Sequence, residues 1–242
     1  MKPVFKMMGD SAIQIDFGQE IAPEVNARIT AFVGLIKEQK IEGIIDMIPA
    51  FCTLLVNYDP RIVAYQELLD RLDELSKLDV QVQKASSKVF EIPVLYDGEG
   101  GPDLENVAKL AGLSKEEVIE IHSGSDYLIY MLGFMPGFPY LGGLDERIHT
   151  PRLDEPRVKI PSGSVGIGAA QTGLYPLESP GGWQLLGRTP VKTYDPNRET
   201  PILFDAGDYI RFVPITEEEY HAIGELVAKN EYECNERMKE LS

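Results

Sequence analysis

The sequence predicts an α+β protein of two domains, and three observations support this prediction. Residues 11–83 alternate between strand and helix patterns. Residues 84–88, KASSK, are polar and typical of a linker. Beyond Ser125 the chain is dense in glycine and proline, with short apolar runs between them. We therefore expect an N-terminal α/β domain over residues 1–84 and a second, β-rich domain over residues 88–242.

The N-terminal domain has the expected order strand, helix, strand, strand, helix, strand. The strands are expected at SAIQIDFG (11–18), IEGIIDMI (41–48), FCTLLVNY (51–58) and DVQVQ (79–83). Apolar residues recur at helical spacing over residues 23–38, and again after Pro60, from Tyr65 to Leu75. This order is that of the ferredoxin-like unit, in which two helices cover one face of an antiparallel sheet.

The second domain is expected to begin with a strand over residues 89–96, followed by two short helices. The first is LENVAKLAGL (104–113), and the second follows Ser114, which forms a capping box with Glu117. Short apolar runs then alternate with turns: YLIYML, SVGIGAA, WQLLG, PILF and YIRFVP. This pattern indicates a barrel or a sandwich. A terminal helix follows a second capping box, which begins at Thr216.

Composition excludes several classes of function. The formal net charge is −16 at pH 7, so a nucleic-acid backbone would be repelled and no nucleic acid is expected as a partner. The first residues contain no apolar stretch of the kind found in secretory signals, which predicts a cytoplasmic protein. The two cysteines, Cys52 and Cys234, form no CxxC or CxxH pair, so neither a disulfide framework nor a metal site is expected.

The run from Tyr127 to Leu144 carries no formal charge over 18 residues, which is close to the length of a membrane span. Its centre, LGFMPGFPYLGG, contains two prolines and four glycines, which oppose a continuous helix. A membrane span is therefore not expected. The run is either part of the core or the wall of a binding site, and its glycines favour a place where the backbone approaches another group closely.

Two polar residues are candidates for chemistry. His122 ends a helix and is followed by SGSD; it can act as a general acid or base, or it can simply be favoured there by the helix dipole. Arg188 follows the turn-forming sequence Pro-Gly-Gly and the only tryptophan, Trp183. Its guanidinium can pair with a substrate carboxylate, or it can be an ordinary surface arginine.

The stretch GIGAAQ does not predict a nucleotide site. It has no third glycine and opens no helix, and the chain contains no GxxxxGK[ST] motif. Strand glycines at a crowded sheet surface explain it better. We therefore expect no familiar ATP site within this chain.

Three long motifs occur in series: HSGSDYLIYMLGFMPGFPYLGGL (122–144), KIPSGSVGIGAAQTGLYP (159–176) and ESPGGWQLLGRTP (178–190). In this order and spacing they strongly resemble the KipI family. That family includes the B subunit of the prokaryotic ATP-dependent 5-oxoprolinase, formerly described as allophanate hydrolase subunit 1. The resemblance implies that the second domain is a cyclophilin-like β-barrel, similar to half of the carboxyltransferase domain of urea carboxylase.

The resemblance also implies an activity. Members act with the A and C subunits of 5-oxoprolinase, and the assembly opens the lactam of 5-oxoproline to give glutamate, with ATP as the cofactor of the assembled complex. This chain is expected to be inactive alone. Two alternatives remain: an inhibitor of the autophosphorylation of a sporulation histidine kinase, and a urea or allophanate carboxyltransferase-like protein.

Positions in the family motifs suggest the site residues. His122 and Tyr127 are the candidates for acid/base or hydrogen-bonding roles, and Arg188 for a carboxylate clamp. The expected substrate-binding residues are Phe134, Pro136, Gly137, Phe138, Tyr140, Gln171, Ser179, Gly181, Gly182, Trp183 and Thr189.

Overall fold

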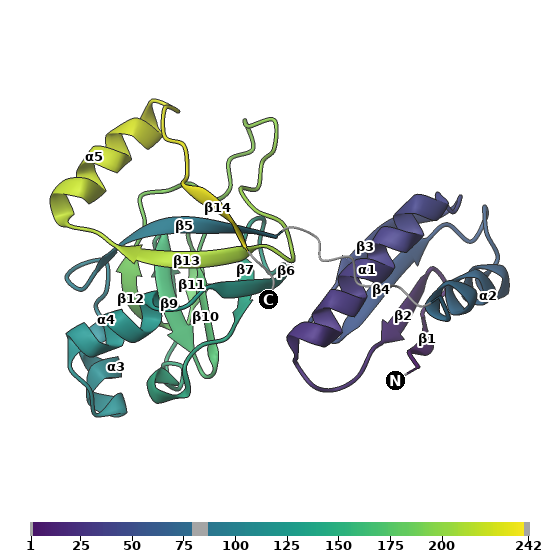
Figure 1. Cartoon of the computed structure of the whole chain (residues 1–242), viewed down its shortest axis with the longest axis horizontal. Helices are drawn as coiled ribbons and strands as arrows, with labels where there is room; N and C mark the ends of the chain where they lie inside the picture. Colours follow the sequence, from purple (N-terminus) through teal and green to yellow (C-terminus); the bar gives the residue numbers. More distant parts are fainter. Residues whose placement is uncertain (1, 79–86, 240–242) are drawn as a thin grey trace. The chain divides into compact units, whose positions relative to one another are not determined.

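The protein is described by a computed structural model that covers residues 2–78 and 87–239 (Figure 1). The chain divides into two compact units, Met1–Ala85 and Ser86–Ser242. Both helices and strands are present, which confirms the α+β class. Most of the expected linker, residues 84–88, lies outside the described residues.

The first unit contains, within residues 2–78, one four-stranded sheet in the order β1-β2-β4-β3, with every neighbouring pair antiparallel. Its elements are β1 (Val4–Met8), β2 (Ala12–Asp16), α1 (Pro23–Gln39), β3 (Ile44–Pro49), β4 (Thr53–Tyr58) and α2 (Tyr65–Ser76). Alternation along β2 and β4 sends Ile13, Ile15, Leu54 and Val56 to one face, where they form a single core with both helices.

The two helices and three of the four expected strands of this unit are confirmed. The expected strand DVQVQ (79–83) lies outside the described residues. The edge strand β1 was not expected from the sequence. It is largely exposed, and only Phe5 of its five residues packs against the core, so its apolar pattern is weak.

The second unit is a closed barrel. Within residues 87–239 its large sheet has the order β12-β9-β10-β7-β6-β13-β5-β14, and β12 also pairs with β5, which closes the barrel. The elements are β5 (Ser87–Tyr96), α3 (Leu104–Ala111), α4 (Lys115–Ser123), β6 (Tyr127–Leu132), β7 (Pro139–Gly142), η1 (Glu146–Ile148), β8 (Arg157–Ile160), β9 (Ser164–Gly168), β10 (Gln171–Leu174), β11 (Ser179–Gly181), β12 (Gln184–Arg188), β13 (Tyr209–Pro214), α5 (Glu217–Ala228) and β14 (Glu236–Lys239). The barrel, rather than the sandwich, is therefore the correct alternative.

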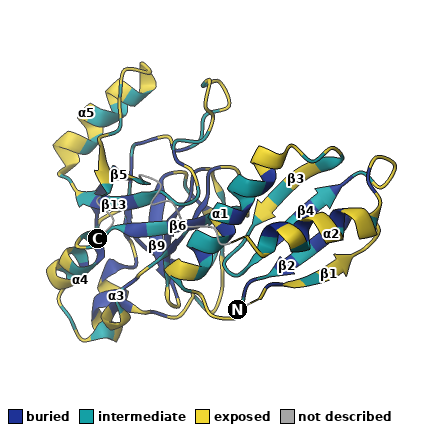
Figure 2. Cartoon of the chain, turned by 45° about the vertical axis from the view of Figure 1, so that its right-hand side comes forward, coloured by how far each residue is buried: buried dark blue, intermediate teal, exposed yellow. Residues whose placement is uncertain are grey.

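The expected helix starts in this unit are confirmed. Ser114 Oγ accepts from the Glu117 amide at 3.1 Å, and the Glu117 carboxylate accepts from the Ser114 amide at 2.7 Å, which completes the capping box of α4. Thr216 forms the same box at the start of α5. Figure 2 shows α5 largely exposed, with no fully buried residue.

The stretch LGFMPGFPYLGG forms the end of β6, a tight turn and β7, which pair as an antiparallel hairpin. Phe134 adopts a left-handed backbone conformation (φ 65°) in this turn, and Gly137 does so as well (φ 76°). In the described part of the chain, no helix has the length and apolar character that crossing a membrane requires.

Candidate functional site

The expected site residues occupy two separate places, because barrel strands alternate between an inward and an outward face. On β10, Thr172 and Leu174 are buried in the barrel core, whereas Gly173 lies against Trp183. His122 and Tyr127 belong to the inner place, and Trp183 to the outer one.

In the barrel core, His122 is completely buried and fully hydrogen-bonded. Its Nδ1 lies 2.7 Å from the Tyr96 hydroxyl, and its Nε2 lies 2.7 Å from Thr172 Oγ1. Thr172 donates its own proton to the Gly166 carbonyl at 3.1 Å, so its oxygen accepts from Nε2–H, and Nδ1 accepts from Tyr96. The imidazole also stacks on Phe212, with ring centroids 4.8 Å apart. The histidine thus joins α4 to β5, β10 and β9.

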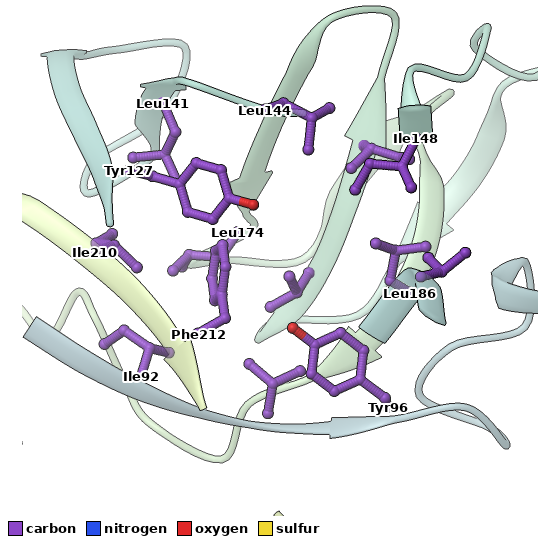
Figure 3. Close-up of a cluster of buried hydrophobic side chains, with 14 of the residues drawn as sticks. Ile92, Tyr96, Tyr127, Leu141, Leu144, Ile148, Leu174, Leu186, Ile210 and Phe212 are labelled. Atoms are coloured by element: carbon purple, nitrogen blue, oxygen red, sulfur yellow. The ribbon is translucent and has the colours of Figure 1, made fainter. Parts of the chain in front are cut away.

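Burial also fixes the charge states of this network. It lowers the pKa of His122 to about 3, so the ring is neutral at neutral pH. Burial raises the pKa of Tyr127, whose hydroxyl donates to the His122 carbonyl at 2.7 Å. Figure 3 shows Tyr96 and Tyr127 pointing into this apolar interior. In this structure neither His122 nor Tyr127 presents any surface to a substrate.

A second, smaller core lies on the outer face of the barrel, and we call it the outer aromatic cluster. It comprises Phe138, Ile160, Tyr175, Trp183 and Leu185, with Met135 and Tyr140 packed against it. Phe138 is at its centre, with ring centroids 5.4 Å from Tyr175 and 5.8 Å from Trp183, both edge-to-face. Phe134, 65% exposed, meets Phe138 at 5.5 Å.

Glycines make this cluster possible. A Cβ on Gly168 would lie 2.5 Å from Trp183 Cδ1, and one on Gly173 would lie 3.1 Å from Trp183 Cζ3. A Cβ on Gly181 would lie 2.8 Å from the Tyr175 hydroxyl, and one on Gly137 would lie 2.9 Å from Tyr194 Cβ. The indole therefore lies flat on the strands, and the dense glycines of the motifs are explained by these close approaches.

Two arginines border the outer aromatic cluster. Arg157 is held in place: it donates to Asp103 at 2.7 Å, and Asp103 in turn accepts from the Leu185 amide at 2.7 Å. Arg152 is exposed, and its guanidinium lies 6.0 Å from the Trp183 ring. Among the described residues, no carboxylate pairs with Arg152. It is thus a free cation beside an aromatic surface in an acidic chain.

The Tyr175 hydroxyl provides a second free polar group. Burial raises the pKa of Tyr175 to about 12, although the nearby charges of Arg152 and Arg157 lower it slightly, so the hydroxyl stays protonated. It has no hydrogen-bond partner within residues 2–78 and 87–239. A ligand on the cluster would meet a hydrogen-bond donor here.

Several expected residues have local structural contacts instead. Arg188 donates from Nε to the Ser162 carbonyl at 3.0 Å, and Thr189, which is buried, accepts from the Val191 amide at 3.2 Å. Gln171 is partly exposed at the start of β10, paired with Gly168. Pro136 is exposed in the turn before β7.

The β8–β11 ribbon, a two-stranded antiparallel sheet, borders the cluster. Gly182 follows it, and its carbonyl accepts from the Leu153 amide at 2.7 Å, which ties the ribbon to the loop that carries Arg152. Ser179 pairs with Ile160, and its Oγ is buried with no partner among the described residues.

Sequence reasoning missed Arg152 and Tyr175. Arg152 lies in the charged segment between β7 and β8, and no local pattern distinguishes it from Arg147 of the same segment. Tyr175 is the penultimate residue of the glycine-rich motif, where it has the pattern of an ordinary apolar strand position. Only the fold brings the two to Trp183. Among the described residues, no three His, Cys, Asp or Glu side chains gather closely enough to hold a metal ion.

Comparison with known proteins agrees with this architecture. Residues 3–204 match the family described as carboxyltransferase domain, subdomain C and D. The chain is 46% identical to the 5-oxoprolinase B subunit of Bacillus subtilis (strain 168) over 234 residues, which is 91% of this chain and 96% of that protein. This chain belongs to the family of 5-oxoprolinase B subunits. The resemblance inferred from the three motifs is thereby confirmed.

Solved structures extend the comparison. The crystal structure of TTHA0988 is 40% identical with a TM-score of 0.75, over 85% of this chain and 40% of that one, so this chain spans less than half of TTHA0988. The Kluyveromyces lactis urea amidolyase has a TM-score of 0.80 over 98% of this chain and 16% of its own, at 22% identity. At that identity the likeness shows a shared fold and nothing about activity.

Proposed function

We propose that this chain is the B subunit of a cytoplasmic, ATP-dependent 5-oxoprolinase, and that its outer aromatic cluster holds 5-oxoproline. The observation that carries the proposal is the free guanidinium of Arg152 beside the Trp183 ring. The identity to relatives named as 5-oxoprolinase B subunits supports it independently.

The chemistry of the substrate matches these groups. 5-Oxoproline is a small ring with a carboxylate and a lactam carbonyl. Its ring would pack on the small exposed edges of Phe138 and Trp183, which are 3% and 5% exposed, and its carboxylate would pair with Arg152, whose forked donors suit two oxygens. The Tyr175 hydroxyl, kept protonated by burial, would donate to the lactam carbonyl. A hydrogen bond at that oxygen strengthens as negative charge develops there, which assists attack on the carbon.

The overall reaction adds water across the lactam C–N bond. The water oxygen joins the carbonyl carbon, the ring nitrogen takes a proton, and glutamate results. ATP hydrolysis supplies the driving force for opening this unreactive amide. We assign substrate binding and orientation to this chain, and the remaining chemistry to its assembly with the A and C subunits.

The expected roles of His122, Tyr127 and Arg188 change in this proposal. We assign His122 and Tyr127 to positioning: through Thr172 they fix β10, whose Gly173 lies beneath Trp183. Arg188 supports the turn at Ser162. The carboxylate clamp passes to Arg152.

Reconstitution tests this proposal. The chain is mixed with the purified A and C subunits, and ATP-dependent glutamate release is measured for the wild type, Arg152→Gln and a matched control, Arg147→Gln. Arg147 is an exposed arginine of the same segment between β7 and β8, and it pairs with Asp145. We expect Arg152→Gln to raise KM at least about tenfold, the loss of about 1.4 kcal/mol of binding, and Arg147→Gln to leave it unchanged. No glutamate release from the wild-type mixture would refute the proposal.

A further inference from the structure

A cavity lies outside the outer aromatic cluster and shares no residue with it. Its volume is about 180 Å³, below the range of about 300–1,000 Å³ for sites of drug-sized ligands, so only a small molecule would fit. It lies between the loop that joins β12 to β13 and the segment that leads from α5 into β14, and Figure 1 shows both on the same side of the barrel. Its lining is Val191, Lys192, Asp195, Arg198, Leu203, Val227, Asn230, Tyr232 and Cys234.

Two cations, Lys192 and Arg198, line this cavity and act on Asp195 from a distance. In the described part of the chain, neither Lys192 nor Arg198 forms an ion pair with a carboxylate. Arg198 donates to the Pro201 carbonyl at 3.1 Å, while its Nε is buried without an acceptor. The buried, unsatisfied Nε of Arg198 is unfavourable for the protein alone, and a bound anion would satisfy it, with the exposed Lys192 as a second cation beside it.

One carboxylate in the lining has a free oxygen. Asp195 Oδ1 accepts from the Asn197 amide at 2.9 Å and from its Nδ2 at 3.2 Å, whereas Oδ2 has no partner among the described residues. The Asn197 amide, with smaller effects from Lys192 and Arg198, holds the pKa of Asp195 below its usual value. Asp195 is therefore ionised at neutral pH.

The rest of the lining is apolar or donates hydrogen bonds. Val191, Leu203 and Val227 form an apolar wall. Burial raises the pKa of Tyr232 to about 12, so its hydroxyl remains a donor. The cavity thus offers two cationic groups, one carboxylate oxygen and a short apolar surface.

We propose that this cavity binds an acidic amino acid. Two carboxylates of the ligand would face Lys192 and Arg198, its ammonium would face Asp195 Oδ2, and its short carbon chain would lie on the apolar wall. The charges of such a ligand complement the lining one for one. The argument uses no residue of the outer aromatic cluster, so it stands or falls separately from the proposed function.

The loop that lines the cavity also contacts the turn of the outer aromatic cluster. Thr193 and Tyr194 lie in the same loop as Lys192. A Cβ on Gly137 would lie 2.9 Å from Tyr194 Cβ and 3.6 Å from the Thr193 carbonyl. A ligand that holds this loop therefore also braces the turn that carries Phe138.

An NMR titration of the full-length, ¹⁵N-labelled chain with L-glutamate tests the proposal, because amide shifts report binding whatever its enthalpy. We expect saturable shifts in residues 191–198 and 230–234. Lys192→Gln should raise Kd at least about tenfold, whereas Lys229→Gln, a neighbouring cation outside the lining, should not. Arg152→Gln should also leave this Kd unchanged, which separates the cavity from the proposed 5-oxoproline site.

Two further ligands test whether the cavity selects acidic amino acids over other anions. Glutarate lacks the ammonium group, so Asp195→Asn should weaken L-glutamate binding but should not weaken glutarate binding. Inorganic phosphate at equal ionic strength should not compete. The proposal is overturned if L-glutamate causes no saturable shifts at these residues, if Lys192→Gln binds as the wild type does, or if phosphate produces the same shifts.

Discussion

The barrel core around His122 and the outer aromatic cluster are built from the same motifs, yet they differ in how their polar groups are satisfied. In the core, both nitrogens of His122 have protein partners at 2.7 Å. On the outer face, Arg152 and the Tyr175 hydroxyl have none among the described residues. A polar residue type in a motif therefore does not indicate a site. Polar groups that the protein leaves unpaired at the edge of an aromatic cluster are the better candidates.

The largest effect on stability should come from the core. His122→Ala leaves the buried Tyr96 hydroxyl without its partner, at roughly 1–3 kcal/mol, removes one of the two hydrogen bonds of Thr172 Oγ1, and opens a cavity. We expect the free energy of unfolding to fall by about 3 kcal/mol or more, measured by urea denaturation. His221→Ala, at an exposed position on α5, serves as the control and should change it by less than about 0.5 kcal/mol. A loss below about 1 kcal/mol for His122→Ala would remove the contrast between the two regions.

The second-largest effect on stability should come from the glycines that lie against Trp183 in the outer aromatic cluster. Gly168→Ala forces the Trp183 ring to move, because the new Cβ would lie 2.5 Å from its Cδ1. We expect a destabilisation of about 1–3 kcal/mol, together with weaker 5-oxoproline turnover in the assembled complex. As a control, Gly34→Ala in α1 places its Cβ in open space and should stabilise by roughly 0.5–1 kcal/mol. Unchanged turnover with Gly168→Ala would argue against the cluster as the substrate surface.

The pH dependence of stability tests whether His122 stays buried and neutral in the folded protein. The folded protein does not protonate His122 until about pH 3, whereas the unfolded chain does so near 6.5. Stability therefore falls as the pH drops below about 6.5, by up to about 1.4 kcal/mol per pH unit. Between pH 7 and 5.5 the wild type should lose about 1 kcal/mol more than His122→Gln does. Equal losses would show that the ring is accessible to protons.

The smallest effect on stability should come from the proposed carboxylate clamp. Arg152 is exposed and forms no ion pair with a carboxylate of the described residues, so Arg152→Gln should change the free energy of unfolding by less than about 0.5 kcal/mol. The same substitution should weaken substrate use strongly. Urea denaturation and the KM measurement together check that stability stays the same while KM rises. A large loss of stability would make Arg152 a structural residue instead.

The sequence predicts the elements well where periodicity is strong, as in α1, α2 and the capped helices α4 and α5. It misses β1, because an exposed edge strand needs no regular apolar face. It also does not reveal the environment of His122, since three strands distant in sequence enclose that side chain. Arg152 is missed for the same reason. It lies beside Trp183, which is distant in the sequence, and only the fold brings the two together.

The most direct test of the central claim uses Trp183 itself. It is the only tryptophan, so a chain grown with 5-fluorotryptophan carries one fluorine, and assembly with unlabelled A and C subunits keeps that signal unique. If 5-oxoproline binds the outer aromatic cluster, the ¹⁹F resonance of the complex should shift saturably as 5-oxoproline is added. A resonance that stays unchanged while the same complex releases glutamate would contradict the claim.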